Sequence, residues 1–155
     1  MSSIPVVGVV FGSESDRTVM AETGTTLERL GIQYEVRVLS AHRNPERTAC
    51  YAREAQQRGI RVLIAGAGMS AHLAGALAAH SPLPVIGVPI DSSPLGGFDA
   101  LLSMVQMPAG VPVATLAVGS AGARNAAVLA AQILALGDSM VAERLIAFRA
   151  ELQSN

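Results

Sequence analysis

Residues 5–11 read Pro-Val-Val-Gly-Val-Val-Phe, and Gly12-Ser13-Glu14-Ser15-Asp16 follows directly. The first seven residues are almost continuously apolar, without the alternation of a strand that has one face in water. This pattern is typical of a strand in a parallel sheet that is covered on both faces. The polar residues that follow are typical of a helix start. The beginning of the chain therefore predicts the strand-then-helix unit of an α/β protein.

Four further short apolar runs resemble the first and are also predicted to be strands. Between the first two runs, apolar residues from Val19 to Leu30 recur at helical spacing, and Gly31 follows as a stop signal. A second helix is predicted from Pro45 to Gly59, because proline is harmless at a first helical position and glycine favours a helix end. Strands that alternate with helices predict a doubly wound, five-stranded parallel sheet. The predicted strands span residues 5–11, 34–39, 61–65, 84–88 and 111–116.

Two more helices are predicted after the fifth strand. Residues 121–136 carry alanines that would let a neighbouring backbone approach closely. After Gly137, a last helix is predicted whose apolar residues form one stripe. Two interpretations of this stripe stay open: it covers its own sheet, or it packs on a neighbouring subunit. The stripe consists of Val141, Leu145, Phe148 and Leu152.

Composition limits the class of protein. A length of 155 residues predicts one domain over residues 1–155. Half of the residues are hydrophobic and only 15% are charged, so part of the exterior is predicted to be buried in a homo-oligomer. The formal net charge is −1 and the chain has no Lys/Arg cluster, which argues against nucleic acid and membrane surfaces as partners. A small-molecule substrate is the better expectation.

Several chemistries are excluded by residues that the chain lacks. All 11 basic residues are arginine, so no lysine is available for a P-loop, a Schiff base or a phospho-receiver site. Cys50 is the only cysteine, which excludes an internal disulfide and a Cys-based metal cluster. The three histidines are widely spaced, and we expect no metal site.

Two stretches bear on cellular location. Residues 1–6 lack the pattern of a signal peptide, so a cytoplasmic protein is expected. Residues 62–90 are apolar enough to resemble a membrane span, but histidines, prolines and glycines interrupt them. We interpret this stretch as buried strands that are joined by loops.

Ligands of open parallel sheets bind outside the carboxyl ends of the strands, so the loops after the strands form the candidate site. After the first strand, Ser13 and Asp16 lie where a helix start would favour an anion such as phosphate. The alternative is that they only cap this helix. After the second strand, Ser40, His42 and Arg43 stand together. Histidine gives and takes protons near neutral pH, and arginine binds phosphate through a paired fork of donors, so this loop is predicted to carry the chemistry.

The third loop begins with Gly66-Ala67-Gly68 and reaches His72. Its glycines would let the backbone approach a flat ligand closely. The spacing is not that of the dinucleotide fingerprint, and the loop follows the third strand, so NAD is rejected. His72 is either a competing catalytic histidine or a helix-start histidine bonded to nearby backbone. After the fourth strand, Asp91 either contacts substrate or turns the chain.

Several motifs, taken in order and spacing, resemble the N5-carboxyaminoimidazole ribonucleotide (N5-CAIR) mutase family, also described as the phosphoribosylaminoimidazole carboxylase catalytic subunit family. The resemblance continues through residues 110–115 and 125–134 and runs nearly from end to end. The motifs are Gly12-Ser13-Glu14-Ser15-Asp16, Ser40-Ala41-His42-Arg43, Gly66-Ala67-Gly68 with Ala71-His72-Leu73, and Val105-Gln106-Met107-Pro108.

This resemblance implies a flavodoxin-like, three-layer α/β/α sandwich with an extra C-terminal helix, assembled into a homo-octamer. It implies conversion of N5-CAIR to 4-carboxy-5-aminoimidazole ribonucleotide (CAIR) in purine biosynthesis, without cofactor or metal. A functional link to the synthetase that makes N5-CAIR follows from the same resemblance. His42 is implied as the general acid and base. The implied substrate-binding residues are Ser13, Asp16, Ser40, Arg43, Gly66, Gly68 and His72.

The family also has a branch that carboxylates aminoimidazole ribonucleotide (AIR) directly with carbon dioxide. Met69-Ser70 and Leu73-Ala74-Gly75 depart from the Gly-Ala and Leu-Pro-Gly of many mutases, so this direct carboxylase is the nearest alternative. An alternative of a different class is a non-catalytic flavodoxin-like nucleotide-binding module.

The chemistry of the implied reaction agrees with the residues present. A ring carbon of an aminoimidazole is already nucleophilic, so no electron sink is needed. The protein must supply an anchor for the phosphate, a closed pocket that retains carbon dioxide, and a proton shuttle. Asp16 beside a phosphate would be repulsive, so it is predicted to accept hydrogen bonds from the ribose hydroxyls.

Overall fold

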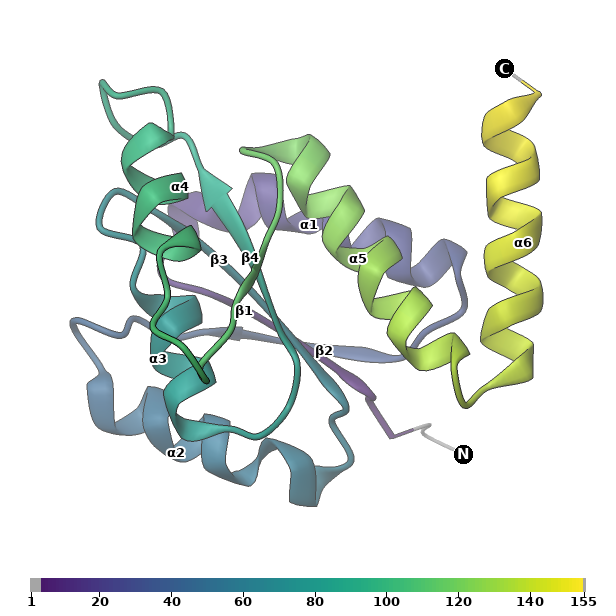
Figure 1. The fold of residues 1–155 in the computed structure, drawn as a ribbon, viewed down its shortest axis with the longest axis horizontal. Helices are drawn as coiled ribbons and strands as arrows, with labels where there is room; N and C mark the ends of the chain where they lie inside the picture. The colour runs from purple at the N-terminus through teal and green to yellow at the C-terminus, as the bar shows by residue number, and fades with distance from the viewer. Residues whose placement is uncertain (1–3, 155) are drawn as a thin grey trace.

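A computed structural model describes residues 4–154 and contains a five-stranded parallel sheet (Figure 1). The strand order β2-β1-β3-β4-β5 is that of a flavodoxin-like doubly wound sheet, so the predicted fold class is confirmed. Residues 1–3, which belong to the stretch without a signal-peptide pattern, lie outside the described residues. The strands are β1 (Val7–Phe11), β2 (Tyr34–Val38), β3 (Val62–Gly68), β4 (Val85–Ile90) and β5 (Ala114–Thr115).

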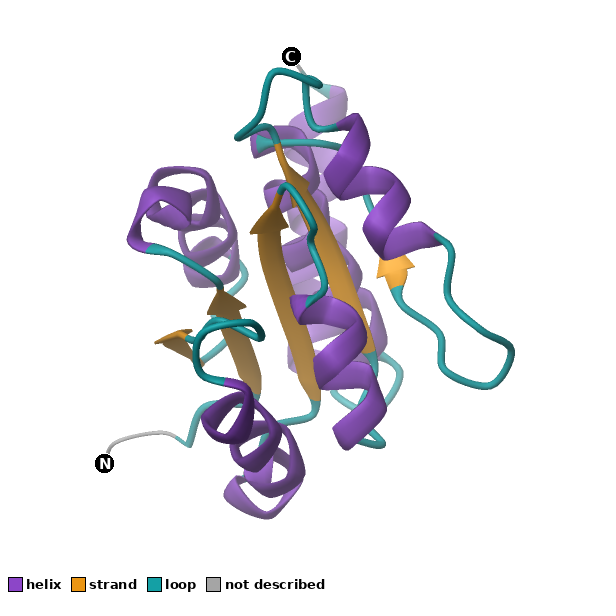
Figure 2. Cartoon of the chain, turned by 90° about the vertical axis from the view of Figure 1, so that its left-hand side faces the viewer, coloured by secondary structure: helices purple, strands orange, loops and turns teal. Residues whose placement is uncertain are grey.

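Helices cover both faces of this sheet and give it three layers (Figure 2). One layer contains α1 and α5, which pack on each other, and the opposite layer contains α2, α3 and α4. The α-helices are α1 (Arg17–Arg29), α2 (Pro45–Ala55), α3 (Leu73–His80), α4 (Phe98–Val105), α5 (Ser120–Ala135) and α6 (Ser139–Gln153), and two 3-10 turns are η1 (Glu14–Asp16) and η2 (Gln56–Arg58). None of the helices in residues 4–154 combines the length and the apolar character that a membrane crossing requires.

The strands β1, β3 and β4 are apolar on both faces because two hydrophobic cores share the sheet. The edge strand β2 differs from the apolar run predicted there, because it carries Glu35 and Arg37 and is partly exposed. Along β3, Val62 and Ile64 point into the core under α1 and α5, whereas Leu63 and Ala65 point into the core under α2 and α3. All of these side chains are fully buried. A strand that is buried on both faces needs no polar residue at alternate positions, which explains the continuous apolar runs in the sequence.

The main differences from the predicted elements are two strand boundaries and one helix that was not predicted. The third strand continues to Gly68, because residues 66–68 pair with β4 instead of forming a loop. The fifth strand contains only Ala114 and Thr115, since no other residue of 111–116 forms a strand pair with β4. The short helix α4 was not predicted; it starts after two left-handed glycines, Gly96 and Gly97, which resemble a loop in sequence.

The last helix, α6, stands away from the sheet and packs its first half on α5 (Figure 1). Val141 is buried, and Leu145 and Phe148 pack against the same core, whereas Leu152 at the end of the stripe is exposed. The Arg144 guanidinium donates a hydrogen bond to the Gly31 carbonyl oxygen at 3.0 Å, which ties α6 to the end of α1. The chain itself therefore covers three of the four stripe positions.

Gly122 is the position at which the fold tolerates a side chain least. A Cβ atom there would overlap the backbone of Ala117, which cannot move aside as a flexible side chain could. Gly122→Ala is therefore expected to lower the free energy of unfolding by about 1–3 kcal/mol, as other overpacking substitutions do. Urea unfolding would measure the change.

Gly75→Ala is the matched control, because this glycine also lies inside a helix but its Cβ would meet only the flexible end of Met107, at 3.4 Å. The control is expected to be neutral or slightly stabilising, since alanine favours a helix over glycine. Equal losses in both variants would contradict the packing argument.

Candidate active site

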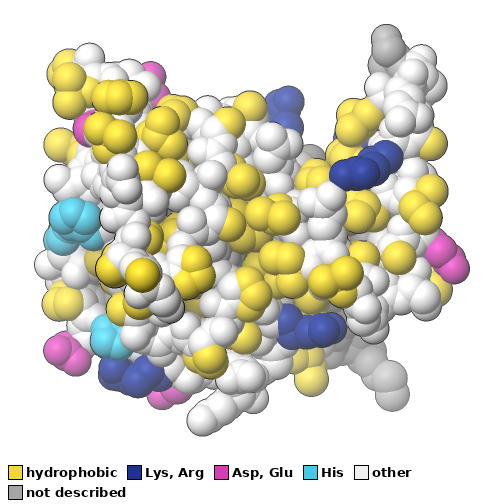
Figure 3. Space-filling model, viewed as in Figure 1, with side chains coloured by type: hydrophobic (Ala, Val, Ile, Leu, Met, Phe, Trp, Pro, Cys, Tyr) yellow, Lys and Arg dark blue, Asp and Glu magenta, His cyan; other side chains and the backbone are white. Residues whose placement is uncertain are grey.

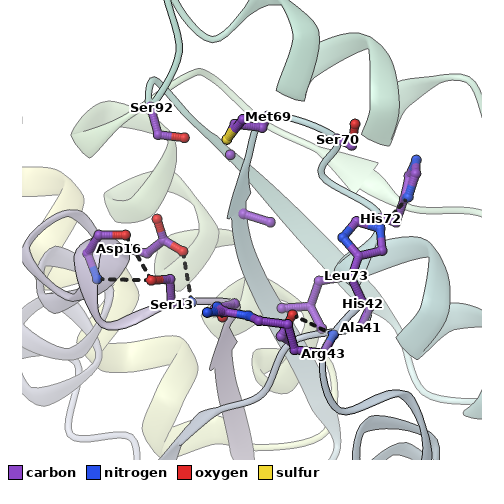
Figure 4. A pocket seen from close by; sticks show the side chains of 15 residues that line it. Ser13, Asp16, Ala41, His42, Arg43, Met69, Ser70, His72, Leu73 and Ser92 are labelled. Atoms are coloured by element: carbon purple, nitrogen blue, oxygen red, sulfur yellow. Dashed lines mark hydrogen bonds between the residues drawn. The ribbon is translucent and has the colours of Figure 1, made fainter.

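The loops that follow β1, β2, β3 and β4 meet at one edge of the sheet and line an open cavity of about 670 Å³. This is the edge at which doubly wound folds bind ligands, because the crossovers diverge on either side of β1. Figure 4 shows Ser13 and Asp16 on one side of the cavity and His42 and His72 on the other. The lining residues are Gly12, Ser13, Ser15, Asp16, Ser40, Ala41, His42, Arg43, Ala67, Gly68, Met69, Ser70, His72, Leu73 and Ser92.

Ser13 and Asp16 form a capping box at the start of η1. The Ser13 side chain accepts the Ser15 backbone N–H at 3.4 Å, and Asp16 Oδ2 accepts the Ser13 backbone N–H at 3.1 Å. The capping interpretation of the sequence is thus confirmed, yet both residues also line the cavity. The cap fixes their backbone and leaves Asp16 Oδ1 without a hydrogen bond to the described residues, so that this oxygen is available to a ligand.

Burial raises the pKa of the Asp16 carboxyl, and the Ser13 hydrogen bond and the Arg43 charge oppose this rise only in part. The neighbouring Glu14 behaves differently, because its hydrogen bond to Arg17 lowers its pKa. Arg17 Nε lies 2.6 Å from the Glu14 carboxylate and compensates its charge. The approach of an anion to this loop is therefore opposed mainly by Asp16.

Arg43 extends from the loop after β2 toward the loop after β1. Its Nη2 donates a hydrogen bond to the Gly12 carbonyl oxygen at 2.8 Å, and its backbone N–H donates to Ser40 Oγ at 3.1 Å. Arg43 lines both the main cavity and an adjoining hollow of about 410 Å³, which is also lined by Asn44. Arg43 therefore places a positive charge between Ser13 and Ser40, where a phosphate could bind to all three side chains.

The two candidate catalytic histidines contact each other. His42 Nε2 lies 2.7 Å from His72 Nδ1, and the rings meet edge to face with their centroids 4.9 Å apart. A hydrogen bond between two ring nitrogens requires one proton, so one ring donates and the other accepts. The two histidines are therefore one pair that can hold a proton beside the cavity.

The glycines of the third predicted loop have different environments. Gly68 lines the cavity. Gly66 lies inside β3 and is not among the lining residues, and a Cβ there would overlap the Met20 side chain. The structure thus brings Ser13, Asp16, Ser40, His42, Arg43, Gly68 and His72 together around the cavity, and Gly66 stands behind them.

The predicted site residues do not include every side chain that lines the cavity, and Ser92 and Met69 are the two that matter most below. Ser92 lines the cavity, whereas Asp91, which was singled out, does not. The available signal was the end of β4 at Ile90, because the first residues after a strand are the ones that face this edge. Met69 also lines the cavity, and its departure from the family pattern was the signal for it. Within residues 4–154 no three His, Cys, Asp or Glu side chains gather as they would around a metal ion.

Comparison with known proteins agrees with this geometry. A family model described as AIR carboxylase matches residues 6–155. The chain belongs to the AIR carboxylase family. The resemblance noted in the sequence is therefore confirmed, and it covers all the strand-end loops that form the cavity.

Relatives and solved structures of the AIR carboxylase family are close to this chain. An N5-carboxyaminoimidazole ribonucleotide mutase of Pseudomonas aeruginosa is 57% identical over 145 residues, which cover 94% of this chain and 89% of that protein. A bifunctional purine synthesis protein purC/E of Dictyostelium discoideum is 54% identical over 84% of this chain and 13% of that much longer protein. A crystal structure of Treponema denticola PurE superposes with a TM-score of 0.87 at 28% identity and covers 97% of this chain and 92% of that one.

Proposed function

We propose that this protein is an N5-carboxyaminoimidazole ribonucleotide mutase, which moves the carboxylate of N5-CAIR from nitrogen to the ring carbon and forms CAIR. The observation that carries the proposal is the division of the cavity into two ends. Arg43, Ser13 and Ser40 supply a cationic and hydroxyl-rich end that suits a phosphate, and the His42–His72 pair supplies a proton at the other end. The substrate in the name of the Pseudomonas aeruginosa relative has both features, a phosphate and a carbon that must lose a proton.

The proposed reaction has two steps that balance in atoms and protons. In the first step the carbamate C–N bond breaks, carbon dioxide leaves, and the electron pair stays on the nitrogen, which takes a proton. In the second step the ring carbon attacks carbon dioxide, a C–C bond forms, and the ring carbon loses its proton. One proton is given and one is taken back, so a single acid–base group can serve both steps.

His42 is proposed as this acid–base group. Its Nε2 forms a hydrogen bond with His72 Nδ1. This bond orients the His42 ring, and the His72 nitrogen can share the proton. An imidazole suits the task because its ordinary pKa lies near neutral pH, where both protonation states are accessible. His72 is proposed as a substrate-binding and positioning residue beside His42.

The ribonucleotide part of the substrate is proposed to lie across the cavity. Arg43, with Ser13 and Ser40, would bind the phosphate, and the backbone of Gly68 would line the part of the cavity that receives the flat ring. Asp16 Oδ1 would accept hydrogen bonds from the ribose hydroxyls, while Oδ2 stays with the Ser13 N–H. Gly66 would act indirectly, because it keeps β3 close to Met20 and thereby holds the residues that follow it.

Asp16→Asn is expected to raise the thermal stability of the protein and to weaken its binding of CAIR. Because burial raises the pKa of Asp16, the folded protein holds this proton more tightly than the unfolded chain does. The carboxyl therefore destabilises the fold as the pH rises from its unfolded pKa through the raised folded value. Asparagine keeps an acceptor for the Ser13 N–H without the buried charge, so the Tm at pH 7 is expected to rise by about 2–4 °C.

The same substitution removes a charged acceptor from the ribose. The Kd for CAIR is expected to increase about tenfold, since a hydrogen bond to a charged group is worth more than one to a neutral amide. Thermal unfolding between pH 4 and pH 8 and titration calorimetry would measure the two effects. A Tm that falls equally at every pH would contradict the account of Asp16.

The oligomer, the location and the pathway link are part of the same proposal. Hydrophobic side chains gather across the face that carries α5 and along the projecting α6 (Figure 3), and such a surface supports assembly with other copies of the chain. Large exposed apolar residues near α4 add to this surface. The number of eight subunits in the proposed homo-octamer comes from the family resemblance. We also propose a cytoplasmic location, an N5-CAIR synthetase as the source of the substrate, and a reaction without cofactor or metal. The link to the synthetase and the cofactor-free reaction rest on the family resemblance.

The deciding experiment supplies each possible substrate alone. N5-CAIR in buffer depleted of carbon dioxide should give CAIR, followed by its ultraviolet absorbance, and AIR with bicarbonate should give much less. The reverse result would make the chain a direct carboxylase. Binding of both nucleotides without any turnover would make it a nucleotide-binding module.

A further inference from the structure

Met69 holds a backbone conformation that glycine usually adopts. Its φ angle is +54°, and within residues 4–154 no other residue except glycine has a positive φ. An L-residue in this left-handed region brings its Cβ close to a carbonyl oxygen, which costs free energy. Strained residues at the rim of a site point to a function that the strain serves.

The neighbouring residues fix the left-handed turn at position 69. Gly68 ends β3 so close to Ser92 that a Cβ there would overlap the serine side chain, so this part of the backbone cannot shift toward β4. The His72 N–H donates to the Ser70 carbonyl oxygen at 2.8 Å, which closes the turn just before α3. The chain therefore bends at Met69, and the side chain is left on the rim of the cavity (Figure 4).

Met69 differs in character from the rest of the lining. Most of the lining side chains are hydroxyls, charged groups or imidazoles, and the apolar ones are small or buried. Leu73 is only 3% exposed, whereas Met69 is 60% exposed. Met69 is therefore the one large apolar side chain of the lining that is free to lie over a ligand, and a methionine is flexible enough to adapt to it.

The geometry points to Met69 as an apolar cover that retains carbon dioxide while it passes from nitrogen to carbon, an inference that rests on the proposed function. Between the two steps the cavity holds AIR and free carbon dioxide. Polar groups can anchor AIR through its phosphate and ribose, but carbon dioxide is uncharged and has no comparable anchor. An apolar side chain over the open side slows its escape and keeps water away from the ring carbon.

Isotope retention tests this role directly. Substrate labelled with ¹³C in its carboxylate is converted in buffer that contains unlabelled bicarbonate, and the label in CAIR is measured by mass spectrometry after correction for breakdown without enzyme. Wild-type protein should retain most of the label. Met69→Gly should increase the fraction of label lost about tenfold, because the apolar cover is gone.

Two further variants separate the side chain from the backbone. Met69→Asn also suits a left-handed turn but is polar, so it should lose label as Met69→Gly does. Met69→Leu keeps an apolar side chain of similar size and should retain label like the wild type. Met69→Gly should also raise the Tm by about 2–4 °C, because glycine relieves the strained turn.

The outcomes distinguish this inference from the proposed function. Wild-type protein that forms no CAIR from N5-CAIR would overturn both. Wild-type protein that retains label, together with glycine and asparagine variants that retain it equally well, would overturn only the role of Met69. A Met69→Gly variant that is less stable than the wild type would overturn the claim that the turn is strained.

Discussion

His42→Asn is expected to lower kcat for the conversion of N5-CAIR to CAIR by about 10²–10⁴-fold, the usual contribution of a general acid–base group. Asparagine is close in size to histidine and can still form a hydrogen bond with His72, whose Nδ1 lies 2.7 Å from His42 Nε2. It cannot carry a proton near neutral pH. The loss should therefore appear in kcat, while the Kd for CAIR stays near the wild-type value.

The comparison with His72→Asn tests which ring transfers the proton. If His42 is the acid–base group, the His72 variant should lose less activity, because it loses only the partner that orients His42 and shares its proton. An active His42→Asn variant, with an inactive His72→Asn variant, would transfer the role to His72. Kd measurements on both variants would show whether either substitution only disrupts binding.

The fold was predictable because its core gives a strong local signal. The strands β1 and β3 are buried on both faces, so nearly every residue in them is apolar, and the pattern is visible in the sequence. The C-terminal end of the sheet gives no such signal. The strand β5 pairs through only two residues, and α4 begins directly after a left-handed Gly97, so tertiary contacts rather than local sequence set these boundaries.

The site was predictable in its residues but not in its contacts. Topology alone brings the ends of β1, β2 and β3 to one edge, so Ser13, His42 and His72 were expected to lie close together. The strands β2 and β3 are not neighbours, because β1 lies between them. A hydrogen bond between His42 and His72 depends on how far each loop reaches over the end of β1, and no local pattern in the sequence contains that distance.

The strained turn at Met69 is a second feature that the sequence could not predict. The sequence marks it as a departure from the family pattern, but only the structure shows the positive φ and the exposed side chain on the rim. The tight contact between Gly68 and Ser92 that forces the turn joins the end of β3 to the loop after β4, and a helix and a strand separate the two residues in the sequence. Strain of this kind is a property of packing, and composition or periodicity cannot indicate it.

Arg43→Met is expected to raise the Kd for CAIR about 100-fold, since two hydrogen bonds from a charged fork to a phosphate would be lost. Methionine keeps much of the apolar stem of arginine, so the loss of affinity for CAIR can be assigned to the guanidinium rather than to packing. The hydrogen bond to the Gly12 carbonyl oxygen would also be lost, but this bond lies on the exposed rim of the site and affects stability little. Titration calorimetry at fixed ionic strength would measure the change in Kd.

Arg47→Met is the matched control, because this arginine is exposed on the adjacent helix α2 and does not line the cavity. It should leave the Kd unchanged, although both variants remove one positive charge from the same region. The Kd of Arg43→Lys for CAIR should fall between those of the wild type and Arg43→Met, since an ammonium keeps the charge without the paired donors.

The nucleoside of CAIR, which lacks the phosphate, is the decisive ligand. If Arg43 binds the phosphate, Arg43→Met should bind this nucleoside as the wild type does, and an equal loss for both ligands would assign Arg43 to another part of the substrate.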